Sequence, residues 1–247
     1  MTHKSLTELL CFVFLGLLML SATLSAHAAS ITIDSTNRVI NELTDLGGLQ
    51  FNQSSSNSLG IFSNLVSSSF TVYDDLGAPL LQNSASAFQL STISSGGDSL
   101  SITAAGMANG LVFAPGPSSP GASALSLLSV TFTLDNWASY NAQHLLSGNV
   151  GGIYESSAGL SNVFGDSTDG AYAYSGILAP GTYTYSVFAS GFIPLSDDGG
   201  FAPAFDSSLL VTIVPEPSSL LLLTSCLPVL IILAFRRSSS LPRPSFG

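Results

Sequence analysis

Few residues between the two apolar ends of the chain could catalyse a reaction. His144 is the only histidine between residues 29 and 214, so it would have to be the base that accepts a nucleophile's proton. No serine lies in a Gly-x-Ser-x-Gly turn, and this region contains no cysteine. One histidine without cysteine also cannot supply the ligands that zinc needs. We therefore expect no enzymatic activity and a structural role for His144.

Paired carboxylates suggest a second kind of chemistry. Asp166 and Asp169, followed by Gly170, are better calcium-ligand candidates than the adjacent pairs Asp74–Asp75 and Asp197–Asp198. None of them matches the Asp-x-Asp-x-Asp-Gly loop, and aspartate and glycine are also ordinary turn residues. A glycosidase would need two carboxylates at a defined separation across a sugar, which sequence adjacency does not indicate. The sequence therefore predicts no cofactor and leaves calcium as an alternative.

Aromatic residues raise the hypothesis of carbohydrate binding, because sugars stack on aromatic faces. Trp137 follows a predicted strand and the polar pair Asp135–Asn136, which favours a position at the rim of the domain. Packing in the core is the alternative for the tyrosines that accompany it, which are Tyr140, Tyr154, Tyr172 and Tyr174.

The charge of this region is strongly negative. Residues 29–214 contain thirteen acidic residues against Arg38 alone, with no lysine, so the net charge is near −12. Such a surface repels the phosphate backbone, which argues against nucleic acid as a partner. Cys11 and Cys226 both lie outside the region. The region is therefore predicted to be held together by its own core, without a disulfide.

Alternating apolar residues predict β-strands. The clearest strands are Leu128–Leu134, with a bulge expected near Leu127, and Leu209–Ile213. Residues Ala171–Ile177 and Thr182–Ser190 predict an antiparallel hairpin, because a Pro-Gly turn separates them.

Further strands are expected where β-branched and aromatic residues alternate with glycine-rich or proline-rich turns. Serine-rich patches such as Ser54–Ser56 and Ser67–Ser69 suit exposed edges or loops, and Asn136–Leu146 is the one helix-like stretch. Together these elements predict an all-β fold, an antiparallel β-sandwich or jelly roll spanning 29–214. The further strands are Leu59–Val66, Phe70–Tyr73, Ser86–Ile93, Leu100–Thr103 and Leu111–Phe113.

The amino-terminal segment has the pattern of a signal peptide. Lys4 precedes the apolar stretch Leu9–Leu24, and Ala26 and Ala28 provide the small-x-small site of signal peptidase. The sequence predicts a signal helix over 1–28 and cleavage after Ala28. An uncleaved amino-terminal anchor is the alternative. In both cases the following region is exported.

The carboxyl-terminal segment combines three unlike elements in a fixed order. Val214-Pro215-Glu216-Pro217 (motif residues 215–217) is followed by the apolar run Ser218–Phe235 and then by Arg236 and Arg237. The prolines favour an extended linker. The apolar run of 18 residues would be about 27 Å long as a helix, close to the thickness of a bilayer core. The arginines would stop translocation and begin a basic cytoplasmic tail, 236–247.

This order of elements resembles the PEP-CTERM sorting signal of Gram-negative bacteria, and the resemblance covers Val214 to Arg237. It departs from the family pattern in a longer tail, Ser238–Gly247, and in Thr224–Cys226 and Pro228 within the predicted transmembrane helix 218–235. The resemblance implies that an exosortase recognises segment 215–247 and that the protein is associated with the surface or with exopolysaccharide.

The resulting hypothesis is a non-enzymatic protein that crosses the inner membrane, is anchored there before processing and then reaches the cell surface or the extracellular matrix. Two alternatives stay open. One is a carbohydrate-binding or calcium-dependent adhesin-like module with the same fold. The other is a permanently anchored single-pass envelope protein that no sorting enzyme processes.

Overall fold

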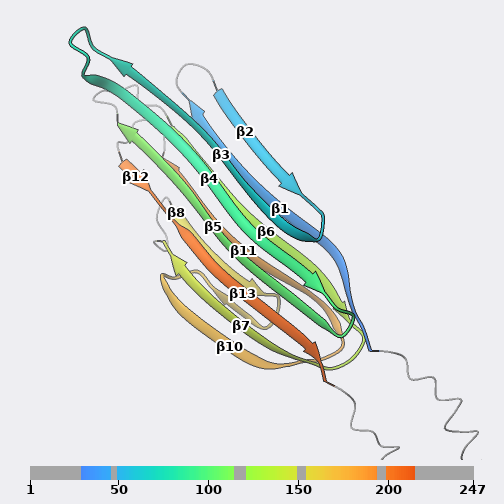
Figure 1. Cartoon of the computed structure of the whole chain (residues 1–247). Coiled ribbons are helices and arrows are strands. Elements are labelled where there is room, and N and C mark those ends of the chain that lie inside the picture. The colour runs from blue at the N-terminus through green and yellow to red at the C-terminus, as the bar shows by residue number, and fades with distance from the viewer. Residues whose placement is uncertain (1–28, 46–48, 114–120, 149–153, 194–198, 215–247) are drawn as a thin grey trace, which may run out of the picture. The chain divides into compact units, whose positions relative to one another are not determined.

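The computed structural model describes residues 29–45, 49–113, 121–148, 154–193 and 199–214 (Figure 1). The predicted signal segment 1–28 and the sorting segment 215–247 lie outside these residues, including the predicted helices at both ends. Within the described ranges, no helix has the length and apolar character needed to span a bilayer. The described residues belong to a compact unit, Ala29–Val214.

The described residues fold into β-strands, as predicted. They are β1 (Ile31–Asp45), β2 (Leu49–Ser56), β3 (Gly60–Tyr73), β4 (Pro79–Ser95), β5 (Ser99–Phe113), β6 (Ala122–Leu134), β7 (Ala138–Ser147), β8 (Tyr154–Leu160), β9 (Phe164–Asp166), β10 (Gly170–Leu178), β11 (Gly181–Ile193), β12 (Gly199–Phe201) and β13 (Ala204–Ile213).

The strands form two antiparallel sheets, consistent with a β-sandwich. The six-stranded sheet has the order β2-β1-β6-β11-β8-β9. The seven-stranded sheet has the order β10-β7-β13-β5-β4-β3, and β12 adds to it by pairing with β5. The long strands run along one another in Figure 1. One core fills the space between the sheets, because alternate residues of each strand point toward the opposite sheet.

The strands with the strictest alternation bury the predicted side chains. Leu128, Val130 and Phe132 of β6 are fully buried, as are Tyr185 and Val187 of β11. The bulge expected near Leu127 is wrong, because β6 pairs with β11 in an unbroken register. Leu125 and Leu127 lie half-buried on the other face of β6. The register shift in this part of the sheet falls instead on β1, between Ile33 and Ser35.

The helix-like stretch Asn136–Leu146 is a strand, so that prediction is wrong. β7 pairs with β13 on one side and with β10 on the other. Ala138, Ala142 and His144 of this strand are buried, whereas their neighbours in sequence are exposed or half-buried. The alanines and leucines suggested a helix, but two flanking strands satisfy the backbone of β7, and tertiary context overrides such a propensity.

The predicted hairpin of Ala171–Ile177 and Thr182–Ser190 is also wrong. Both segments are strands, β10 and β11, but β10 pairs with β7 in one sheet whereas β11 pairs with β6 and β8 in the other. The connection at Ala179 and Pro180 therefore passes between the sheets. The Tyr183 hydroxyl donates a hydrogen bond of 2.9 Å to the Ala179 carbonyl and holds this connection.

The two charged residues of β1 that point inward are buried. Arg38 and Glu42 both have 0% exposed surface. Arg38 donates a hydrogen bond of 2.9 Å from Nη2 to the Gly60 carbonyl, and its Cζ lies 5.9 Å from the centre of the Phe62 ring, within the range of a cation–π contact. Burial lowers the pKa of Arg38. Because Arg38 is the only basic residue besides His144 between residues 29 and 214, the exposed charges of the described region are acidic.

Candidate functional site

Titratable and hydroxyl groups from three strands meet between the two sheets. His144 of β7 is 3% exposed, and its Nδ1 lies 2.6 Å from the Oγ of Ser207 on β13. Tyr185 of β11, in the opposite sheet, forms a short hydrogen bond with the same Ser207 hydroxyl, and its own hydroxyl lies 3.5 Å from His144 Nδ1. We call His144, Tyr185 and Ser207 the buried polar cluster.

Aromatic rings pack beside this cluster, and one of them is bonded to a carboxylate. The rings of Phe164 and Tyr174 stack with their centres 4.5 Å apart, and the Phe164 ring lies 5.2 Å from the His144 ring. Tyr174, on β10, donates a hydrogen bond of 2.8 Å to Oδ1 of Asp166, on β9. Since β9 and β10 are edge strands of different sheets, this hydrogen bond links the sheets along one side.

The environment favours the uncharged forms of His144, Tyr185 and Tyr174. Burial lowers the pKa of His144, and the negative charge of Asp166 opposes this effect. Burial raises the pKa of Tyr185, while its hydrogen bond with Ser207 acts in the other direction. The pKa of Tyr174 is raised chiefly by its hydrogen bond to Asp166. At this site His144 Nε2 and Asp166 Oδ2 are buried and have no hydrogen-bond partner among the described residues.

The contact between Ser207 and His144 has the residue types of a nucleophile and its base, but not their surroundings. The Ser207 side chain is 2% exposed and lies between two sheets, so a substrate cannot reach its hydroxyl in this structure. Among the residues that the structure describes, no carboxylate accepts a hydrogen bond from the histidine ring and orients it. The arrangement suits a structural role, in which His144 holds β7, β13 and β11 together.

This burial predicts a pH-dependent stability. The unfolded chain has a histidine pKa near 6.5 and the folded chain a lower one, so the unfolded state binds more protons as the pH falls through 6.5. Stability is therefore complete above about pH 6.5 and decreases below it, by up to about 1.4 kcal/mol per pH unit. Urea unfolding of the 29–214 unit between pH 7.5 and 5.5 measures this slope. His144→Gln should flatten it, and an equal slope in both proteins would contradict the prediction.

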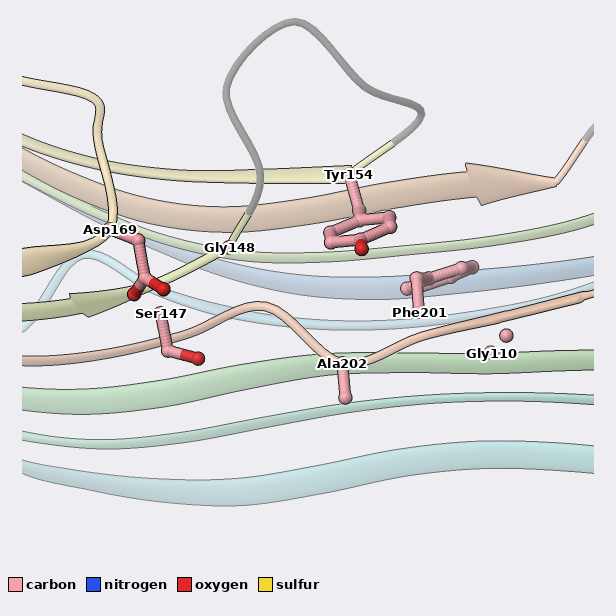
Figure 2. Close-up of a pocket in the computed structure, with 8 residues that line it drawn as sticks. Gly110, Ser147, Gly148, Tyr154, Asp169, Phe201 and Ala202 are labelled. Atoms are coloured by element: carbon pink, nitrogen blue, oxygen red, sulfur yellow. The ribbon is translucent and has the colours of Figure 1, made fainter.

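A second feature is an open pocket of about 610 Å³ (Figure 2). Its lining includes Ser147 at the end of β7, Tyr154 at the start of β8, Asp169 in the turn between β9 and β10, and Phe201 of β12. Figure 2 shows the rings of Tyr154 and Phe201 toward the right of the view and the side chains of Asp169 and Ser147 toward the left. One carboxylate, one hydroxyl and one half-buried phenol ring could contact a small polar ligand.

The structure separates the two aspartates considered for calcium. Asp166 points toward Tyr174, which donates to its carboxylate, whereas Asp169 is exposed and lines the pocket. In the part of the chain that the structure describes, no group of three or more histidine, cysteine, aspartate or glutamate side chains converges. Calcium would therefore have to take most of its ligands from backbone carbonyls and water.

Trp137 lies away from the pocket. It is 53% exposed in the connection between β6 and β7, at the opposite end of β7 from Ser147, a distance of about 30 Å along an extended strand. Trp137 and Tyr154 therefore do not form one stacking platform. Tyr140, Tyr154, Tyr172 and Tyr174 are half-buried and pack against the core, which was the alternative for the tyrosines.

Both ends of the described domain meet at the connection that carries Trp137. The Val214 amide donates a hydrogen bond of 2.8 Å to the Trp137 carbonyl. Ser30 donates two to Asp135, from its amide at 2.7 Å and from its hydroxyl at 2.9 Å. Val214 is the one residue of the predicted sorting motif that is described. Ala26, Ala28, Pro215, Glu216, Pro217, Arg236 and Arg237 lie outside the described residues.

The sequence indicated part of these sites. It singled out His144, Asp166, Asp169 and the tyrosines, but not Ser207 or Tyr185 as partners of His144. Ser207 is 63 residues from His144 in the chain, and only the register between β13 and β7 brings them together. The one signal available was the position of a serine among the inward-facing residues of the last strand.

Comparisons with known proteins give little further guidance. No protein-family model matches this chain, and no curated protein sequence matches it significantly. The VP2 subviral particle of infectious bursal disease virus is similar over 77% of this chain and 59% of that chain, with 12% identity and a TM-score of 0.24. A structure of the Gx strain of the same virus is similar over 78% of this chain and 59% of that chain, also with 12% identity and a TM-score of 0.24. This chain thus spans about three fifths of the length of the viral chains, and TM-scores this low carry no inference about it.

Proposed function

We propose that this chain is an exported, non-enzymatic surface or extracellular-matrix protein, sorted by an exosortase-type system. One observation carries the proposal: the motif Val214–Pro217, the apolar run Ser218–Phe235 and the pair Arg236–Arg237 follow one another in the order of a PEP-CTERM signal. The signal-peptide pattern of residues 1–28 supports the same route at the other end of the chain.

The architecture of the described domain is compatible with this role. Ser30 and Val214 are both bonded to the short connection between β6 and β7, so the chain enters and leaves the domain at the same end. A domain of this kind can be carried by a single terminal anchor. Its core needs no disulfide or metal, because two sheets bury a continuous set of apolar side chains.

The proposed partners are the processing enzymes, signal peptidase and exosortase, and the inner membrane before processing. Exopolysaccharide is the proposed neighbour of the mature protein. Nucleic acid does not fit, because the one arginine of the domain is buried and the exposed charges are acidic. Ser207 lies out of reach of a substrate, which supports a role without catalysis.

Replacement of the motif tests the sorting step. In a host that encodes an exosortase, the triple variant Pro215→Ala, Glu216→Ala, Pro217→Ala is expected to keep the apolar run and to accumulate in the inner-membrane fraction. The wild-type protein should lose the run and appear at the surface, because the enzyme must recognise the extended motif. Fractionation followed by immunoblotting measures the difference.

The triple variant Ser238→Ala, Ser239→Ala, Ser240→Ala is the matched control, because it alters three residues just beyond Arg237. It should be processed like the wild type. If the wild type and both variants stay in the membrane with the apolar run attached, the chain is a permanently anchored single-pass protein and the sorting proposal is wrong.

A further inference from the structure

The strand at one edge of the seven-stranded sheet is long and bears no charge. β3 has 14 residues and pairs with β4 alone among the described strands, so most backbone N–H and C=O groups on its other side have no strand partner. Two backbone groups of β3 are already bonded to side chains: the Gly60 carbonyl accepts from Arg38, and the Leu65 amide donates to Oδ1 of Asn64. Its sequence contains no aspartate, glutamate, lysine, arginine, histidine or proline. Edge strands with these properties are templates for pairing with another chain.

β3 carries exposed apolar side chains on both of its faces, between polar residues. Ile61 and Leu65 point to the outer face and are 75% and 59% exposed. Phe62, Val66 and Phe70 are on the face toward the opposite sheet, and Phe70 is still 43% exposed. The polar side chains between them are uncharged, so no charge on the strand opposes pairing at this edge.

The other edges are protected. β9 has three residues, and β10 is tied to the opposite sheet by the hydrogen bond from Tyr174 to Asp166. β2 has eight residues, most of them polar. Short length and polar side chains are the usual ways in which proteins prevent pairing at edges. Of the four edge strands that the described residues form, β3 is the longest, and it combines this length with an absence of charge and several exposed apolar side chains.

β3 is also held in position. The Ser68 hydroxyl donates to Oε2 of Glu42 at 2.5 Å and lies 3.0 Å from the hydroxyl of Thr44, both on β1. Asn64 donates a hydrogen bond of 2.5 Å to the hydroxyl of Ser54 on β2. These bonds fix the edge strand against the six-stranded sheet, so little ordering of its backbone is needed before a partner strand pairs. The Leu65 amide would exchange its hydrogen bond of 2.8 Å to Oδ1 of Asn64 for one to the partner.

We propose that β3 is an interface at which two copies of this chain pair edge to edge, extending the seven-stranded sheet from one copy into the next. Charge identifies the partner. A basic protein would bind the acidic surface outside β3. Two copies of this acidic chain, in contrast, repel each other except at a surface that carries no charge. The stretch Leu49–Tyr73, which includes β2 and β3, has no acidic or basic side chain.

The sequence of β3 is complementary to itself. A two-fold axis through Val66 pairs Val66 of one copy with Val66 of the other and places Phe62 opposite Phe70 on the same face. Such cross-strand pairs of aromatic and β-branched residues stabilise antiparallel strands. The interface would give the structural role proposed above a mechanism of assembly.

Cysteine cross-linking tests this pairing in the full chain, exported by a Gram-negative host and treated with a mild oxidant. Cys11→Ser and Cys226→Ser provide a background free of other thiols, because these are the only two cysteines. Val66→Cys should give a disulfide-linked dimer, since directly paired antiparallel residues have Cα atoms about 4.5–5.5 Å apart, within the range of a disulfide. Ser63→Cys should not, because the axis places the two copies of residue 63 about 20 Å apart. Ser175→Cys on edge strand β10 is the second control.

A charge at the interface provides an independent test. Leu65→Lys in the Val66→Cys protein should lower the dimer yield about tenfold, because two lysines then face each other diagonally across the axis. Ile177→Lys on β10, where residue 177 is 67% exposed, should leave the yield unchanged. The pairing is wrong if Val66→Cys cross-links no better than Ser63→Cys or Ser175→Cys, or if Leu65→Lys has no effect. Because dimers are detected with or without the carboxyl-terminal tail, this result is independent of the sorting test.

Discussion

Phe201→Ala is expected to lower the free energy of unfolding of the 29–214 unit by about 3–5 kcal/mol. The Phe201 ring is 5% exposed and packs against backbone of both sheets, at one glycine in each. A Cβ added to Gly191 of β11 would be 2.1 Å from its Cδ2, and one added to Gly110 of β5 would be 2.3 Å from its Cε1. The ring fills the space left by these two glycines, so its loss creates a cavity between the sheets.

Urea unfolding followed by the intrinsic fluorescence of Trp137 measures this effect. Phe201→Leu is the matched control, because it keeps an apolar side chain in the same space and should cost clearly less than the alanine variant. The pocket bordered by Phe201 should also widen in Phe201→Ala. A loss of stability below about 1 kcal/mol would contradict the packing described for this residue.

Gly106→Ala is the second change for which we expect a large effect, a loss of about 1–3 kcal/mol for the addition of one methyl group. Gly106 is on β5, in the middle of the seven-stranded sheet, and faces the other sheet. A Cβ there would lie 2.3 Å from Cζ of Phe205 and 2.4 Å from Oγ of Ser126, so at least one of them has to move. Glycine at this position therefore permits the close approach of the sheets.

A double-mutant cycle with Phe205→Leu separates this steric effect from the difference in strand propensity between glycine and alanine. The shorter side chain should relieve part of the clash, so the double variant should be more stable than the sum of the single effects by about 0.5–3 kcal/mol. Gly165→Ala is the control, because an added Cβ there meets no atom within 4 Å. Purely additive effects, or an equal loss in Gly165→Ala, would show that the contact with Phe205 is not the cause.

The fold class could be predicted because the central strands alternate strictly. In β6, β11 and β13 nearly every second residue is apolar, and a period of two has one structural meaning in a segment of this length. β3 and β5 were each expected as two short strands, because serine, asparagine and glycine interrupt their apolar residues. These polar positions belong to the strands, since the backbone pairing continues through them.

The arrangement of the strands could not be predicted in the same way. Alternation indicates that β10 and β11 are strands, but it contains no information about the sheet that each one joins. The fit of Phe201 to Gly110 and Gly191, and of His144 to Ser207, depends on a register between distant segments. The unpaired edge of β3 likewise follows from topology rather than from composition. Its lack of charge was visible in the sequence, but its meaning depends on its place at the rim of the sheet.

The proposal of export and sorting is tested most directly by the mass of the mature protein recovered from the surface of its host. Intact-mass measurement, together with the terminal peptides, should give a chain that begins at Ala29 and lacks the apolar run Leu220–Phe235. A surface protein that still contains this run would contradict processing by a sorting enzyme. A chain that retains residues 1–28 would contradict cleavage after Ala28.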